Sequence, residues 1–160
     1  MTRDALVEKI SAETGFEARA RYSNQVELRI EPERTVSVLS NLKTAGFRHL
    51  SNITCIDWME RGTIEIVYNL WSYDDRVHVT VKAPVNRDTP VSDTAGNLWP
   101  HAGVYEQELH EMFGVLFRGN PNMGPLFLHN WQDIPPLRKD FDPEEYSRRA
   151  YGMLEEEVRS

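Results

Sequence analysis

The stretch from Trp99 to Phe141, WPHAGVYEQELHEMFGVLFRGNPNMGPLFLHNWQDIPPLRKDF, sets how the rest of the chain is interpreted. Its first part predicts a helix that begins at Pro100 and ends at Gly114. Proline suits a first helical position, and glycine suits the left-handed residue after a last turn. Between them, apolar residues recur at the spacing of one buried helix face: Ala102, Tyr105, Leu109 and Met112.

The residues after Gly114 show no such periodicity. They are rich in glycine and proline, so we expect an extended arm over residues 115–160, with a short terminal helix that Asp142 caps and Pro143 begins. Because the arm has no apolar face of its own, we expect it to be ordered against another protein. Its aromatic and basic residues are typical anchors of protein interfaces.

The polar side of the predicted helix has several interpretations. His110-Glu111 begins like the zinc motif H-E-x-x-H, but Gly114 stands where the second histidine is needed. Glu106, Glu108 and His110 suggest an acid–base site, although residues two apart point to different sides of a helix. The carboxylates otherwise form a solvated acidic face or dock a basic partner surface.

Several segments carry a family resemblance. Residues 105–114, YEQELHEMFG, resemble the signature of the 30-kDa-type subunit of respiratory complex I, which is designated C, and of its relatives. Residues 117–121 and 136–141 resemble that family's G-H-P and P-L-R-K-D-F segments, and residues 53–58 resemble its strand ending in Asp and an aromatic. Gln107, Asn120 and Gly124 stand where the family usually has basic residues. These departures favour a deazaflavin-dependent, ferredoxin-dependent or hydrogenase-linked branch.

The resemblance implies a non-catalytic structural subunit in the peripheral electron-transfer arm of a proton- or sodium-translocating membrane oxidoreductase. It would brace a catalytic subunit related to the large subunit of nickel–iron hydrogenases, and the small subunit with the terminal iron–sulfur cluster. No catalytic, cofactor or metal residue is expected in this chain, and the iron–sulfur clusters would lie in partner subunits. The predicted partner interface comprises Glu106, Glu108, Glu111, Trp131, Arg138, Lys139, Asp140 and Phe141.

Alternatives to this interpretation are a subunit of an energy-converting nickel–iron hydrogenase, a free-standing adaptor, or a small enzyme. Composition limits them. The 160 residues carry a net charge of −7, which argues against nucleic-acid binding. No run of apolar residues is long enough to span a membrane, and the first residues are unlike a signal peptide. Cys55 is the single cysteine, so a thiolate cluster is excluded. We expect a peripheral protein on the cytoplasmic side of the membrane.

Residues 1–90 predict an α+β domain. Helices are expected over residues 3–12 and 32–46, and alternating apolar residues predict strands over 25–30, 53–58, 63–71 and 76–82. The last three strands are joined by short turns and must therefore pair antiparallel. The predicted fold class is α+β, with helices on a mainly antiparallel sheet, followed by a signature helical region at 91–114 and the arm.

The second face of this sheet is expected to be polar and open to solvent or a partner, since it carries Glu65, Asn69, His78, Thr80 and Lys82. We interpret His78 as a surface residue because no second ligand lies at strand spacing. Asp57 and Trp58 are interpreted as a structural strand end rather than a site. Residues 83–91 are interpreted as a connection, with Ser92 capping a short helix.

Overall fold

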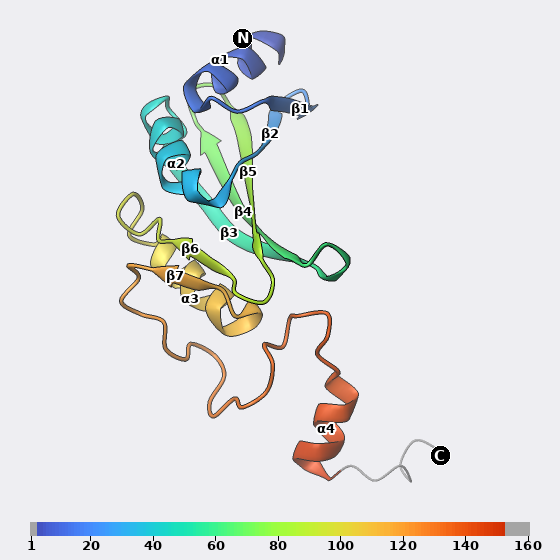
Figure 1. Cartoon of the computed structure of the whole chain (residues 1–160). Helices are drawn as coiled ribbons and strands as arrows, with labels where there is room; N and C mark the ends of the chain where they lie inside the picture. Colours follow the sequence, from blue (N-terminus) through green and yellow to red (C-terminus); the bar gives the residue numbers. More distant parts are fainter. Residues whose placement is uncertain (1–2, 153–160) are drawn as a thin grey trace.

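The computed structural model describes residues 3–152, and the predicted end of the chain beyond them lies outside the described residues (Figure 1). Four helices are present in this range: α1 (Arg3–Thr14), α2 (Thr35–Thr44), α3 (Ala102–Phe113) and α4 (Pro143–Tyr151). Two 3-10 turns are η1 (Pro32–Arg34) and η2 (Met59–Arg61). The strands are β1 (Ala18–Tyr22), β2 (Gln25–Arg29), β3 (His49–Trp58), β4 (Thr63–Ser72), β5 (Val77–Asn86), β6 (Val91–Asp93) and β7 (Leu116–Arg118).

The main sheet has the strand order β1-β2-β5-β4-β3. The predicted antiparallel meander of β3, β4 and β5 is confirmed. β2 pairs with β5 in parallel, because the crossover through α2 makes β2 and β3 run in the same direction. The α+β class and the mainly antiparallel sheet are therefore as predicted.

Helices α1, α2 and α3 lie on one side of this sheet (Figure 1). Apolar residues from both parts of the chain are buried there in one cluster, which includes Leu39, Phe47 and Tyr68 together with Leu109 and Phe117. The domain boundary predicted at residue 90 stays an interpretation of the sequence, since the buried core is continuous across it.

Two predictions between residues 83 and 92 are wrong. β5 continues through Pro84 to Asn86 instead of ending at Lys82. Proline is tolerated there because the pairing with β2 ends at Lys82, so β5 needs no further N–H donor on that side. Ser92 does not cap a helix, because it is buried within β6, which pairs in parallel with β7.

Other differences concern the ends and the short strands. α3 begins at Ala102, two residues after Pro100, with His101 at its N-cap. β1 was not predicted, since its sequence ARARY alternates arginine with alanine rather than with a large apolar residue. The terminal helix α4 is confirmed. Its N-cap Asp142 accepts hydrogen bonds from the backbone N–H groups of Glu144 and Glu145.

Candidate partner interface

The arm, defined here as residues 119–142, contains no helix or strand. It leaves β7, passes α3 and leads into α4 (Figure 1). None of its residues is buried within the chain. Its course is instead set by hydrogen bonds to side chains of the domain, which fall into three groups along its length.

The first group lies at the root of the arm. The Asn120 side-chain amide donates to the carbonyl of Gly103, at 3.0 Å, and to the Glu106 carboxylate, at 2.9 Å. Glu106 also accepts from the Thr94 hydroxyl, at 2.6 Å, and from the backbone N–H of Ala95, at 2.7 Å. This carboxylate therefore joins α3, the segment after β6 and the arm.

Glu106 is 0% exposed, so its prediction as part of a solvated or partner-docking acidic face is wrong. Residues 94 and 95 cover this side of α3, which the spacing of the apolar residues did not indicate. Desolvation raises the pKa of Glu106, although the hydrogen bonds from Thr94, Ala95 and Asn120 oppose that shift. A buried carboxylate with three donors is satisfied, and its role is to hold structure.

The second group is centred on Glu111. Its carboxylate accepts hydrogen bonds from three consecutive backbone N–H groups, those of Leu126, Phe127 and Leu128, at 3.0, 2.9 and 2.8 Å. Desolvation opposes ionisation of Glu111, but the three amide donors outweigh it and the pKa is lowered. The Gln107 side chain donates to the carbonyl of Gly124, at 3.0 Å, and so holds the adjacent turn.

The arm then returns over the end of α3. The backbone N–H of Leu137 donates to the carbonyl of Met112, at 3.0 Å. Gly114 has a φ of +81°, and a Cβ at this position would meet Pro135 at 3.1 Å. The glycine is needed both for the left-handed end of the helix and for the close approach of the arm.

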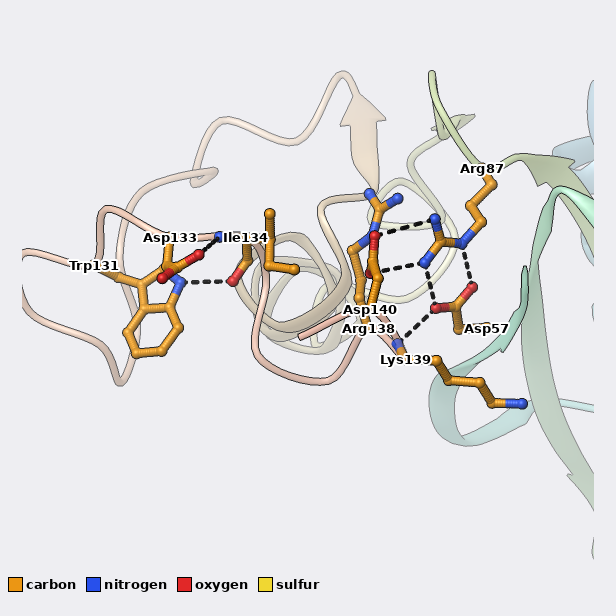
Figure 2. A network of polar contacts seen from close by, with 8 residues as sticks. All are labelled: Asp57, Arg87, Trp131, Asp133, Ile134, Arg138, Lys139 and Asp140. Atoms are coloured by element: carbon orange, nitrogen blue, oxygen red, sulfur yellow. Dashed lines mark hydrogen bonds and ion pairs between the residues drawn. The ribbon is translucent and has the colours of Figure 1, made fainter. Parts of the chain in front are cut away.

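The third group is a charged network around Arg87 (Figure 2). Arg87 donates to both oxygens of Asp57, at 2.7 and 2.9 Å, and to Asp140 of the arm, at 2.8 Å. The backbone N–H of Lys139 also donates to Asp57, at 2.8 Å. Asp57 is 3% exposed, so a paired, buried carboxylate of β3 holds the end of the arm.

The electrostatics of this network follow from its contacts. The hydrogen bonds from Arg87 hold the pKa of Asp57 below its ordinary value, and the N–H of Lys139 adds to that effect. Arg87 lowers the pKa of Asp140 in the same way. Both carboxylates are therefore ionised at neutral pH, and Arg87 neutralises them.

An aromatic cluster closes the arm onto α4. The ring of Trp131 lies 5.5 Å from that of Phe141 and 4.7 Å from that of Tyr146, measured between centroids. Asp133 forms an ion pair with Arg149 of α4, and the indole N–H of Trp131 donates to the carbonyl of Ile134 (Figure 2). The arm and α4 thus form one connected strap.

The predicted interface residues have different environments. Glu108 is exposed on α3, whereas the carboxylate of Glu111 is occupied by the chain's own arm. Trp131 and Phe141 are half-buried against each other. The remaining predicted residues, Arg138, Lys139 and Asp140, lie around the Arg87 network (Figure 2).

Sequence reasoning missed Arg87 and gave Asp57 only a structural role. Arg87 lies in the segment interpreted as a connection, and no local pattern marks it as a partner of residues some 50 positions away. Asp57 belongs to the stretch that resembles the family, and that was the available signal. The amide side chains Gln107 and Asn120, noted as departures from the family pattern, both contact the arm.

The side chains considered for catalysis do not converge. Glu106 is sealed in its own hydrogen bonds, Glu108 is exposed, and Nδ1 of His110 contacts the carbonyl of Val115 at 2.9 Å. Cys55 is buried, which raises the pKa of its thiol. Within residues 3–152, no group of three or more His, Cys, Asp or Glu is arranged to hold a metal ion.

The outward side of the strap is apolar at several points. Phe127 is 61% exposed, Leu137 56% and Ile134 39%. A hollow of about 330 Å³ between α3 and the arm is lined by residues that include His110, Met123, Leu128 and Trp131. An extended segment with a fixed backbone and exposed apolar side chains defines a protein-docking module.

Comparison with known proteins identifies the family. Residues 28–147 match the family described as the respiratory-chain NADH dehydrogenase 30 Kd subunit, and the chain belongs to this family. This confirms the resemblance seen in residues 105–114. None of the helices within residues 3–152 is long and apolar enough to cross a bilayer.

Two relatives and one solved structure illustrate the match. The C-type subunit of the F(420)H(2) dehydrogenase of Methanosarcina mazei is 30% identical over 137 residues, which cover 82% of this chain and 82% of the relative. The C-type subunit of the NADH-quinone oxidoreductase of Roseiflexus sp. is 30% identical over 125 residues, covering 76% and 72%. A chain in the structure of the membrane-bound sulfane sulfur reductase, an archaeal respiratory membrane complex, is 29% identical. It superposes with a TM-score of 0.87 over 96% of this chain and 93% of that one.

Proposed function

We propose that this chain is a non-catalytic structural subunit of a complex I-like membrane oxidoreductase, and that its strap docks onto larger subunits of that complex. The strap comprises the arm and α4. The similar proteins named above are subunits of an F(420)H(2) dehydrogenase, an NADH-quinone oxidoreductase and a membrane-bound sulfane sulfur reductase complex. Family membership therefore supports a place in an assembly of this kind.

The observation that carries the proposal is the combination of a fixed backbone with outward apolar side chains. The N–H groups of residues 126–128 are held by Glu111, and that of Lys139 by Asp57. With the backbone held at these points, Phe127 and Leu137 stay largely exposed. Exposed apolar side chains of this kind gain free energy when a partner covers them.

Preorganisation explains why the anchors are polar. A disordered arm would lose conformational entropy when it bound, and that loss would reduce its affinity. Hydrogen bonds to Glu106, Glu111 and Asp57 order the backbone before the partner arrives. The apolar side chains then remain available to the partner instead of being used for the chain's own core.

The proposed partners are the subunit related to the large subunit of nickel–iron hydrogenases and the small subunit that holds the terminal iron–sulfur cluster. In this proposal the chain binds no cofactor of its own and lies on the cytoplasmic side of the membrane. Its contribution is rigidity, because electron transfer between clusters requires a fixed geometry. The electron donor would be NADH, a reduced deazaflavin, ferredoxin or the substrate of a related hydrogenase.

The experiment is co-purification of a tagged chain from membranes solubilised in mild detergent. We expect stoichiometric recovery of partner subunits and of iron, with the partners identified by mass. A monomeric, iron-free chain under conditions that preserve the membrane complexes would overturn the proposal. A salt-labile, substoichiometric partner would instead indicate the free-standing adaptor.

The role of the strap is tested by the double variant Phe127→Ser with Leu137→Ser. We expect it to lose at least about 30-fold in partner retention, because each side chain is placed as an interface anchor worth roughly 2 kcal/mol or more. The matched control is Val104→Ser with Leu116→Ser, which removes two exposed apolar side chains outside the strap. Equal losses in both double variants would contradict a specific role for the strap.

A further inference from the structure

The two faces of the main sheet have different surroundings. One face is packed against the helices, and a complete cross-strand row on it is buried: Leu28, Val81, Tyr68 and Ile53. Within residues 3–152, no helix covers the opposite face, called here the open face (Figure 1). Its strand residues are mostly half-buried or exposed.

The open face is preformed by side-chain contacts between neighbouring strands. In one row, the Asn69 side chain donates to Asn52, at 2.7 Å, and accepts from the Thr80 hydroxyl, at 3.0 Å. In the next row, the rings of Trp71 and His78 lie 4.4 Å apart between centroids. These contacts fix the side chains without help from another chain, so the face presents a defined surface.

The charge of the open face is opposite to that of the chain. The whole sequence has 25 acidic and 18 basic residues and a net charge of −7. The strands of the open face reverse this ratio, because their charged side chains are four basic and two acidic: Arg19, Arg21, Arg29, Lys82, Glu27 and Glu65.

Pairing within the face leaves positive charge over. Glu27 accepts from both Arg21, at 3.0 Å, and Lys82, at 2.9 Å, so two cations share one carboxylate. Arg29 and the buried Glu65 form a neutral pair. Arg19, at the edge strand, is paired with Glu17 at 3.2 Å.

Two further cations lie at the end of the face, over the ring of Trp58. The Arg61 guanidinium lies 4.4 Å from the ring centroid and the Lys139 ammonium 5.6 Å. Among residues 3–152, neither forms an ion pair with a carboxylate, although Glu60 is exposed in the same turn. A cation over an aromatic face stays available to an approaching anion.

We propose that the open face docks a carboxylate-rich segment of a neighbouring subunit. This inference rests on the proposed function and adds a second docking surface, separate from the outward side of the strap. The excess cations select an acidic partner. The half-buried rings of Trp58 and Trp71, with Met59 at 50% exposure, provide apolar contacts that a partner protein uses and a free anion does not.

The test is the double variant Arg21→Glu with Arg61→Glu, assembled in the membrane complex. It leaves Glu27 paired with Lys82 and Glu65 paired with Arg29, so no carboxylate of the face loses its last partner. The matched control is Arg34→Glu with Arg118→Glu, two exposed arginines on η1 and β7 that lie off the face. Both double variants change the charge of the chain by the same amount.

The measurement is the fraction of chain that stays with the partner subunits between 50 and 500 mM KCl. We expect the face variant to lose about tenfold in retention and the control to behave as the unmodified chain, because contacts between complementary charges are lost on reversal. Carbodiimide treatment of the unmodified complex is the second measurement. It should join Lys139 to an aspartate or glutamate of a partner, and it does not depend on the folding of a variant.

The outcomes separate the two proposals. If the face variant is retained normally and no link to a partner forms, while Phe127→Ser with Leu137→Ser is lost, the open-face inference fails and the strap stands. If both double variants are retained normally, both proposals fail. Loss of the face variant alone, together with the carbodiimide link, supports the acidic partner.

Discussion

The domain and the arm are ordered by different physical means. The domain buries a continuous set of apolar side chains between one sheet face and three helices. The arm buries none of its residues, and its backbone is held by three carboxylates of the domain: Glu106, Glu111 and Asp57. Burial gives stability that is shared by the whole domain, whereas each hydrogen-bonded anchor stabilises a few residues around it.

This difference explains how the strap can be fixed and still offer an apolar surface. A segment held by its own apolar residues would have to turn them inward. The following experiments test the comparison, from the largest expected effect to the smallest.

Phe47→Ala should unfold the domain and the arm together. Phe47 is 0% exposed, and truncation of a buried phenylalanine costs roughly 3–5 kcal/mol of unfolding free energy. Since every anchor of the arm belongs to the domain, urea unfolding followed by amide exchange should show both parts lost in one transition. Tyr73→Ala, at a 68% exposed position, should stay within about 0.5 kcal/mol of the unmodified chain.

Arg87→Ala should cost roughly 3 kcal/mol, because it leaves the buried carboxylate of Asp57 without its cation. It should also release the end of the arm, measured as faster trypsin cleavage after Arg138 and Lys139. Arg87→Lys keeps the charge but cannot contact both Asp57 oxygens in the same way, so an intermediate effect is expected. Unchanged cleavage in Arg87→Ala would mean that the network does not hold the arm.

Acid should release the same network by a smaller amount than Arg87→Ala. The pKa of Asp57 is depressed below its ordinary value of 3.8. Its contribution is therefore complete above pH 3.8 and is lost only as the pH falls toward the depressed value. We expect the NMR signal of the Lys139 amide to move below pH 3.8, and not in Asp57→Asn. A midpoint above 3.8 would contradict the pairing.

Glu111→Gln should affect the middle of the arm alone. Loss of the charge weakens three hydrogen bonds to the amides of residues 126–128, and each hydrogen bond to a charged group contributes about 1.5–3 kcal/mol. Because glutamine keeps one acceptor oxygen, we expect amide exchange there to rise about tenfold with little change in the domain. Glu108→Gln, the exposed neighbour on α3, is the control and should change neither.

Asp142→Ala should have the smallest effect. It removes the side chain that caps α4 and should cost about 1 kcal/mol of helix stability. Circular dichroism should show a small loss of helix, and Asp142→Asn should restore it. A loss of domain stability in Asp142→Ala would show that α4 and the core are more tightly coupled than the comparison holds.

Much of the fold is predictable because its signals are local. Alternation of apolar residues marks β4 and most of β3 and β5, and a spacing of three and four marks α3. β1 is missed because alanine gives little contrast with arginine, and Pro84 is misread because its tolerance depends on where β2 ends. The candidate site is predicted in position, since the arm and residues 131–141 are part of it, but not in its internal contacts.

The sequence by itself determined the α+β class, the antiparallel meander, the signature helix and an arm without an apolar face. These follow from periodicity and from the preferences of glycine and proline, which act over a few residues. Only the tertiary structure decided that Glu106 is buried, that Glu111 holds the chain's own arm and that Arg87 joins Asp57 to Asp140. A carboxylate looks the same in the sequence whether it faces water, a partner or backbone N–H groups, and its surroundings are set by segments far away in the chain.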